Sequence, residues 1–313
     1  MAKVLENEPQ NAKPHADARR PSLRVAVIRT ARPKQWAKNV LVFAAPAAAG
    51  VLTHGAALGK TLAAFALFCL LASGTYFLND AFDAKADRQH PTKRFRPIAA
   101  GALSVRAGRA IGLALLVVSI AASFAITWRL AVVMAIYIAV QVAYSVYLKH
   151  QPIYDLAAVA SGFVLRAIAG GLAAGVRVSE WFLIVATFGS LLMVTGKRVA
   201  EHAELGDDRG AHRATLDAYS STFLRTVLGV SAGGAILAYV LWAFSLETAR
   251  LHHADPIWYQ LSIIPVIIAL LRYTFLVEGG KGAKPEDLVL GDRSLQLLGI
   301  IWAVLFALGV YAG

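Results

Sequence analysis

An asparagine and three aspartates recur at helical spacing directly behind a long apolar run. Asn79, Asp83 and Asp87 follow one another at intervals of four residues. Asp80 precedes the last two of these by three and seven residues, so all four side chains share one broad face of a helix. Like charges on one face repel, and a hard cation such as Mg²⁺, which prefers oxygen ligands, relieves that repulsion. The predicted magnesium ligands are Asn79, Asp80, Asp83 and Asp87, and the three aspartates are also predicted to be catalytic.

A basic segment restrained by prolines follows these acids. Lys93, Arg94 and Arg96 lie between Pro91 and Pro97. Because carboxylates hold Mg²⁺ and bases bind phosphate oxygens, the two segments together suit a magnesium-bound diphosphate. Neutralising the charge that grows on a diphosphate leaving group lowers the barrier to breaking its bond to carbon. The alternative is a solvated helix end, in which the acids pair with the bases among them.

A second charged cluster begins one helical turn before Glu201, at Lys197 and Arg198. One interpretation is a second anion site, in which both bases face a phosphate and Glu201 or Glu204 supports a metal or a sugar hydroxyl. The alternative is a simple cluster of ion pairs at a helix end, since opposite charges at i,i+3 and i,i+4 stabilise helices. In the functional interpretation Lys197 is a catalytic residue, and Arg198 and Glu201 bind substrate.

Two ionisable residues lie inside a single apolar run, where a charge costs a few kcal/mol and usually faces a cavity or a partner. Asp155 and Arg166 are about three helical turns, or about 16 Å, apart, too far to pair with each other. Asp155, with Tyr154, suits either a catalytic or sugar-binding role or helix capping. Arg166 suits either structural hydrogen bonding or contact with an anionic substrate group. Near the start of the first run, Lys38 is placed either to reach a polar cavity or to belong to an interfacial belt.

Composition indicates an integral membrane protein. Of the 313 residues 58% are hydrophobic and only 16% are charged, and the mean hydropathy is +0.57. The net charge of +12 is explained by basic cytoplasmic loops, so we expect no nucleic-acid partner. The single cysteine, Cys69, lies in an apolar run, which excludes a disulfide framework.

Apolar runs long enough to cross a bilayer recur along the chain. They lie at approximately 37–53, 61–81, 105–126, 129–148, 153–175, 180–197, 222–245, 258–277 and 294–312. We therefore expect an all-α, polytopic bundle of about nine transmembrane helices, forming one catalytic domain, 22–313, behind a disordered tail, 1–21. With the N-terminus inside, 25 of the 31 Lys and Arg residues fall on cytoplasmic segments. This bias predicts a multi-pass protein of the cytoplasmic membrane, with its active site in a polar cavity that faces the cytoplasm.

The aspartate pattern of 79–87 at the inner end of the second expected helix, with a second charged loop after the sixth, resembles the UbiA-type intramembrane prenyltransferase superfamily. Within that superfamily the segments 32–39, 87–101 and 197–201 look like the decaprenyl-phosphate phosphoribosyltransferase branch. The resemblance implies Mg²⁺-dependent transfer of 5-phosphoribose from phosphoribosyl diphosphate to a polyprenyl phosphate in the bilayer. Pyrophosphate is released, and the product leads toward the arabinose donor of the cell wall.

The resemblance also implies roles for individual residues. The four oxygen ligands at 79–87 would hold Mg²⁺ and the diphosphate, and the bases at 93–96 would grip phosphates. An anionic lipid nucleophile needs a further basic site, for which the chain offers Lys38, Arg166, Lys197 and Arg198.

Two other functions remain open at this level. Glu201, Glu204 and Asp208 reproduce the spacing of the second acidic motif of ordinary prenyltransferases, which favours transfer from a polyprenyl diphosphate to an aromatic acceptor. A lipid or small-molecule transporter is the third function, with Asp155 and Arg166 marking its path. The sequence also leaves a homo-oligomer open.

Overall fold

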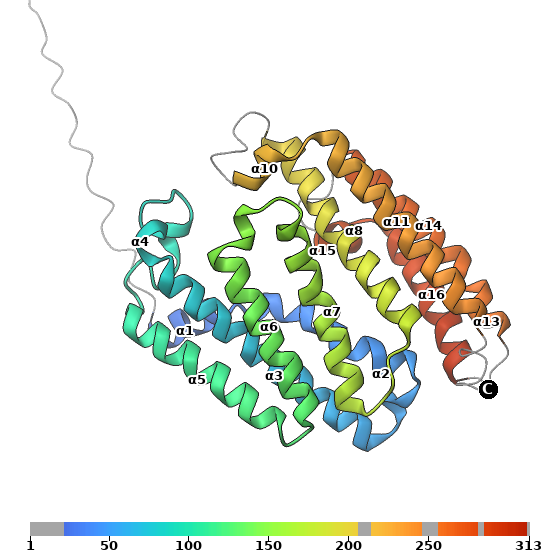
Figure 1. Ribbon diagram of the computed structural model, residues 1–313, viewed down its shortest axis with the longest axis horizontal. Coiled ribbons are helices and arrows are strands. Elements are labelled where there is room, and N and C mark those ends of the chain that lie inside the picture. The colour runs from blue at the N-terminus through green and yellow to red at the C-terminus, as the bar shows by residue number, and fades with distance from the viewer. Residues whose placement is uncertain (1–21, 206–213, 246–255, 281–284, 312–313) are drawn as a thin grey trace, which may run out of the picture.

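The structure of this chain is a computed structural model that describes residues 22–205, 214–245, 256–280 and 285–311. Every regular element within these ranges is a helix (Figure 1). The expected tail, 1–21, and Asp208 lie outside the described residues. The α-helices are α1 Leu23–Ala31, α2 Ala44–Ala48, α3 Gly55–Phe82, α4 Ala84–Asp87, α5 Val105–Ser123, α6 Trp128–Val146, α7 Tyr154–Ala174, α8 Glu180–Leu205, α10 Ala214–Ala218, α11 Ser221–Phe244, α13 Ile257–Leu261, α14 Ile263–Glu278, α15 Pro285–Gly291 and α16 Arg293–Tyr311. The 3-10 helices are η1 Pro33–Phe43, η2 Val51–Thr53, η3 Lys93–Phe95 and η4 Leu148–His150.

Eight helical segments in the described part of the chain are long and apolar enough to cross a membrane. They are Gly55–Phe82, Val105–Ser123, Trp128–Val146, Tyr154–Ala174, Glu180–Glu204, Ser221–Ala243, Ile257–Glu278 and Arg293–Tyr311. The all-α class and the multi-pass membrane character predicted from the sequence are therefore confirmed.

The first expected span, 37–53, does not form one long helix, and the expected count of nine is not confirmed within the described ranges. This segment is divided among η1, α2 and η2. The backbone of η1 approaches α7 so closely that a Cβ atom on Gly170 would lie 1.7 Å from the carbonyl oxygen of Val42. A 3-10 helix is narrower than an α-helix, and glycine at 170 leaves room for it. Hydropathy reports that a segment is apolar, but it does not report this change of helix type.

Two hydrophobic cores lie on either side of α7. The first is built around α3, with Phe68 and Leu71 fully buried. The second lies between α8 and α11 and contains Leu224 and Leu228. Helix α7 contributes to both cores and packs against α3, α6, α8 and η1. It therefore joins the N-terminal and C-terminal halves of the bundle.

The charged segments of both halves lie at one end of the bundle. In Figure 1, α4 and α10 lie at the upper end, whereas α2 and α13 lie at the lower end. The start of α7 belongs to the upper end, because Tyr219, which follows α10, donates a hydrogen bond to Asp155. The last turns of α3 and α8 also reach this end (Figure 1). The packing therefore brings acids and bases from distant parts of the sequence to one end of the protein.

Candidate active site

Two buried aspartates and two arginines form a cluster where α3 meets α4, and we call it the acid cluster. Asp80 of α3 accepts hydrogen bonds at Oδ1 from Arg32 Nη2 at 2.6 Å and from Arg96 Nη1 at 3.2 Å. The same Arg96 nitrogen donates to Asp87 Oδ2 at 2.8 Å. The aspartates are almost completely buried, whereas the two arginine side chains are 31% and 29% exposed. The acidic charge is therefore compensated by cations that are themselves open to solvent.

Local geometry explains how the acid cluster forms. The helical hydrogen bonds continue past the end of α3, because Asp87 N–H donates to Asp83 O at 2.8 Å. Asp80 and Asp87 are therefore two turns apart on one face. Arg32 has a left-handed backbone, with φ of 54°, and it turns the chain between α1 and η1. Ser73 of α3 fixes this turn, because its hydroxyl donates to Ala31 O at 2.9 Å.

The donor set of the acid cluster fits a divalent cation held together with substrate oxygens. The two arginines use only Oδ1 of Asp80 and Oδ2 of Asp87 within the described residues. The other oxygen of each carboxylate is left for another cation. Asp83 is exposed, and Asn79 accepts a hydrogen bond from Ser145 of α6 at 3.2 Å. Over the ranges described, no three acidic, histidine or cysteine side chains converge as a complete metal site; Mg²⁺ is commonly held by one or two carboxylates together with water and substrate oxygens.

A second cluster joins the start of α7 to the end of α8, and we call it the α7–α8 cluster. Arg198 Nη1 donates to Glu201 Oε2 at 2.6 Å, and its Nε lies 3.4 Å from Asp155 Oδ2. Lys197 Nζ lies 3.7 Å from Glu201 Oε1. Asp155 and Arg198 are buried, whereas the Lys197 side chain is 47% exposed. The ion pairs predicted from the i,i+3 and i,i+4 spacing are present, whereas the role of Lys197 and Arg198 as an anion site stays a prediction.

Tyr219 completes the α7–α8 cluster, and no sequence pattern indicated it. Its hydroxyl donates to Asp155 Oδ1 at 2.5 Å. Burial, followed by this hydrogen bond to a carboxylate, raises the pKa of Tyr219 far above its usual value. The phenol therefore stays protonated and acts as a donor. Arg32, which contacts Asp80, was also not predicted as a site residue, although it stands directly before Pro33 in a segment that the resemblance had singled out.

Arg166 lies apart from these two clusters in a buried hydrogen-bond network. Its nitrogens donate to Asn39 Oδ1 at 2.7 Å, to Gly162 O at 2.6 Å and to the Tyr137 hydroxyl at 2.9 Å. Asn39 in turn donates to Cys69 Sγ at 3.3 Å. Each guanidinium nitrogen thus has a partner within the protein, and the structural alternative predicted for Arg166 accounts for these contacts.

Three other predicted site residues, Lys93, Arg94 and Tyr154, are exposed near the same end. Lys93 and Arg94 are exposed in η3, and the Arg94 guanidinium lies 4.9 Å from the centre of the Phe95 ring. Tyr154 is exposed at the start of α7. Lys38 is half-buried in η1. Arg96 is therefore the base of its segment that the fold brings to the acids.

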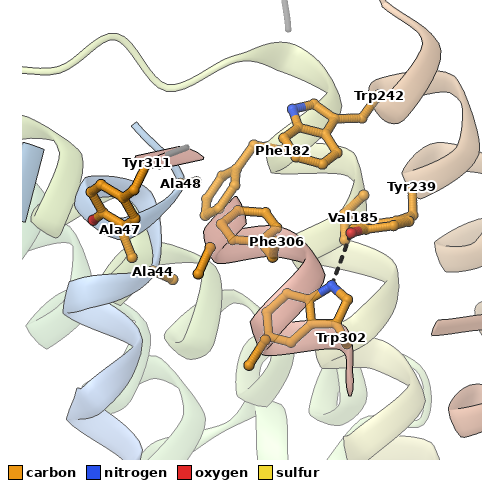
Figure 2. A pocket seen from close by; sticks show the side chains of 12 residues that line it. Ala44, Ala47, Ala48, Phe182, Val185, Tyr239, Trp242, Trp302, Phe306 and Tyr311 are labelled. Atoms are coloured by element: carbon orange, nitrogen blue, oxygen red, sulfur yellow. Dashed lines mark hydrogen bonds between the residues drawn. The ribbon is translucent and has the colours of Figure 1, made fainter. Parts of the chain in front are cut away.

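An apolar cavity of about 380 Å³ lies toward the opposite end of the bundle, between α2, α8, α11 and α16 (Figure 2). It is lined by Ala44, Ala47, Ala48, Phe182, Val185, Tyr239, Trp242, Trp302, Ala303, Phe306, Ala307 and Tyr311. Trp302 Nε1 donates to the Tyr239 hydroxyl at 2.8 Å. Phe182 precedes Arg198 by about 24 Å along α8. This cavity is thus distinct from the polar, cytoplasm-facing cavity expected from the sequence, which stays a prediction.

Comparisons with known proteins give consistent results. Residues 40–298 match the family model described as the UbiA prenyltransferase family. A decaprenyl-phosphate phosphoribosyltransferase of Corynebacterium glutamicum is 46% identical, covering 91% of this chain and 86% of that protein. One of the same description from Mycolicibacterium smegmatis is also 46% identical, covering 91% and 92%. The structure of a UbiA homolog from Archaeoglobus fulgidus bound to DMAPP and Mg²⁺ superimposes with a TM-score of 0.68 at 21% identity, covering 91% of this chain and 97% of that one.

Proposed function

Because this chain belongs to the UbiA prenyltransferase family, we propose that it transfers 5-phosphoribose from phosphoribosyl diphosphate to a polyprenyl phosphate of the decaprenyl type. One observation carries this choice of substrates: relatives named for this reaction are 46% identical over nine-tenths of the chain. The bond between the anomeric carbon and the diphosphate breaks, and a lipid phosphate oxygen forms the new bond to that carbon. The phosphate nucleophile is ionised at neutral pH, so the reaction needs no general base.

The acid cluster is the proposed site of the leaving diphosphate. Mg²⁺ bound by Asp80 and Asp87, with Asn79 and Asp83 as further oxygen ligands, would neutralise charge that develops on the departing pyrophosphate. Arg32 and Arg96 are partly exposed and already lie against the carboxylates. They would exchange these carboxylate oxygens for phosphate oxygens when substrate binds. Lys93 and Arg94, which are exposed in η3, would provide additional positive charge for the phosphates.

The lipid phosphate is assigned to the α7–α8 cluster and to Lys38. Lys197 is half exposed while its partner Glu201 holds it loosely at 3.7 Å, so its ammonium can turn toward an anion. Arg198 adds a buried positive charge beside it. Arg166 supports η1 through its hydrogen bond to Asn39. Tyr154 is exposed at the start of α7 and is assigned to the sugar, whereas Asp155 is buried and anchors Arg198.

A polyprenyl chain needs an apolar path, and the cavity in Figure 2 supports this part of the proposal. Its lining is entirely aliphatic and aromatic apart from the Tyr239 and Tyr311 hydroxyls and the Trp242 and Trp302 indole nitrogens. The charged end lies about 24 Å away along α8. A long lipid with its phosphate at the charged end therefore extends toward this cavity, which a short lipid does not reach.

The proposed orientation puts the charged end in the cytoplasm, because Lys and Arg residues collect there. The substrate phosphoribosyl diphosphate is water-soluble, so this orientation also gives it direct access to the acid cluster. We assign the reaction to a single transmembrane domain, 22–313, of the cytoplasmic membrane, and its product serves as a precursor of the arabinose donor for the cell wall.

A direct assay tests this function. Purified protein is incubated with radiolabelled phosphoribosyl diphosphate, decaprenyl phosphate and Mg²⁺, and the label that enters the organic phase is measured. We expect lipid-extractable label that depends on both substrates and disappears with a chelator. Absence of lipid label under all of these conditions would contradict the proposal.

The same preparation separates the two other functions. An aromatic prenyltransferase would release pyrophosphate from a polyprenyl diphosphate in the presence of a hydroxybenzoate, without any sugar substrate. A transporter would move ligand across vesicles independently of Asp80. The internal hydrogen bonds of Arg166 argue against a conduction path along α7, because each of its guanidinium nitrogens is already engaged.

A further inference from the structure

The hydroxyl of Tyr219 forms hydrogen bonds with Ile153 and Asp155, the residues on either side of Tyr154 at the start of α7. It accepts a hydrogen bond from the Ile153 backbone N–H at 2.5 Å and donates to Asp155 Oδ1 at 2.5 Å. Tyr219 is 64 residues from Asp155 and is buried, with its ring stacked on Phe223 at 5.7 Å. One phenol thus holds both the backbone before Tyr154 and the carboxylate after it.

The backbone that Tyr219 holds is strained. Ile153 has φ of 70° and ψ of −49°, a combination that a β-branched residue rarely adopts. Such a conformation persists only where surrounding contacts enforce it, and such residues cluster at functional sites. The short hydrogen bond from Ile153 N–H to Tyr219 is a contact of this kind.

The carboxylate that accepts the hydrogen bond from Tyr219, that of Asp155, lies beside the buried cation Arg198. Asp155 Oδ2 lies 3.4 Å from Arg198 Nε, but neither atom has a hydrogen bond of good geometry within the described residues. The attraction between them is therefore mainly Coulombic, and it does little to fix the orientation of either side chain. The firm contact on this carboxylate is the one from Tyr219 at Oδ1, so the orientation of Asp155 depends on that hydroxyl.

We propose that Tyr219 is a positioning residue that acts through Asp155 on Arg198, and thereby sets the site for the lipid phosphate. The order of contacts is Tyr219 to Asp155, Asp155 to Arg198, Arg198 to Glu201 and Glu201 to Lys197. This inference rests on the proposed function, since it concerns how one of the two substrates is held. Tyr219 itself is buried and does not touch substrate.

The test is Tyr219→Phe, which removes one oxygen and keeps the stacked ring. We expect the KM for decaprenyl phosphate to rise about tenfold, because a hydrogen bond to a charged group contributes about as much free energy as a tenfold change in affinity. The KM for phosphoribosyl diphosphate and the Mg²⁺ dependence should stay within about twofold, because the acid cluster does not contact Tyr219. A KM does not depend on the fraction of enzyme that is folded, so a partly unfolded preparation still gives the answer.

The matched control is Tyr147→Phe, since Tyr147 is exposed at the same end of the bundle. We expect both KM values to match those of the wild type. A double-mutant cycle with Asp155→Asn then tests the pathway. If Tyr219 acts through Asp155, the KM for decaprenyl phosphate of the double variant equals that of Asp155→Asn alone.

Three results would overturn the inference: unchanged KM values in Tyr219→Phe, with or without a fall in kcat, an equal rise in KM for both substrates, or additive effects in the cycle. Failure of the proposed function is a separate result, since it appears as an inactive wild-type enzyme.

Discussion

The acid cluster and the α7–α8 cluster both bury aspartates near the same end of the bundle, but they differ in where their cations lie. Arg32 and Arg96 of the acid cluster are about one-third exposed, whereas the Arg198 side chain is 4% exposed. An exposed arginine exchanges partners at low cost because water can replace the partner it leaves. A buried arginine without its partner is an uncompensated charge. The first cluster is therefore suited to exchange carboxylates for substrate, and the second is suited to hold a fixed geometry.

Asp80→Asn should have the largest effect on activity. It removes the charge that Arg32 and Arg96 both contact and that a metal would need. We expect the rate of lipid labelling to fall by about 10²–10³ at saturating substrates, as when a group that stabilises developing charge is lost. Asp217→Asn is the matched control, because Asp217 is exposed on α10. A variant at 80 with more than a tenth of wild-type activity would break the assignment of chemistry to the acid cluster.

Arg198→Gln tests how far the stability of the fold depends on the α7–α8 cluster. The substitution leaves the buried Asp155 carboxylate without its cation. We expect the free energy of unfolding in detergent to fall by about 3 kcal/mol, measured by thermal or denaturant unfolding. If stability stayed unchanged while activity fell, Arg198 would be an exchangeable binding residue and the contrast between the two clusters would disappear.

Arg32→Gln is the same change made in the acid cluster. Its side chain is partly solvated, and Arg96 remains as a partner for Asp80. We expect little change in the unfolding midpoint but a roughly tenfold rise in the KM for phosphoribosyl diphosphate, from loss of one charge-assisted phosphate contact. Loss of stability as large as that of Arg198→Gln would contradict the distinction drawn from exposure.

Arg94→Gln measures how far the acid cluster extends. Arg94 is exposed in η3 and lies over Phe95, while Arg96, two residues later, contacts both aspartates. We expect the KM for phosphoribosyl diphosphate to rise less than about threefold, because an exposed charge interacts weakly through water. A tenfold rise, equal to that of Arg32→Gln, would show that η3 folds onto the bound substrate.

The pair between Arg272 and Asp292 provides a partly exposed reference outside both clusters. Arg272 Nη2 donates to Asp292 Oδ2 at 2.8 Å, and Leu295 N–H donates to Asp292 Oδ1 at 2.9 Å. The hydrogen bond from Arg272 is the main cause that lowers the pKa of Asp292 below its usual value. The stabilisation from this group is therefore complete above the pKa of an unfolded aspartate, about 3.9, and is lost as the pH falls through the lower folded value.

We expect this reference pair to have the smallest effect. Comparing unfolding midpoints of the wild type and Asp292→Asn between about pH 5 and pH 3 should show a small difference that shrinks as the solution becomes acidic. A difference that grew on acidification would contradict the lowered pKa.

Several features of the site were predictable because they depend on neighbouring residues. The i,i+7 spacing of Asp80 and Asp87 predicted a shared helix face, and the structure joins both to Arg96. The pairs formed by Lys197 and Arg198 with Glu201 follow from their spacing on one helix. In contrast, Asp83 is exposed, because it lies about 60° around the helix from Asp80, at the edge of the predicted face.

The sequence by itself determined the helical membrane fold, the family and the residues that carry charge. Hydropathy and helical periodicity are properties of short segments, so they can be recognised without knowing how the segments pack. Only the tertiary structure decided that Arg32 meets Asp80 across 48 residues and that Tyr219 meets Asp155 across 64. These pairings depend on the packing of α1 against α3 and on the docking of the residues after α10 at the start of α7, and the same packing decides which cluster stays open to solvent.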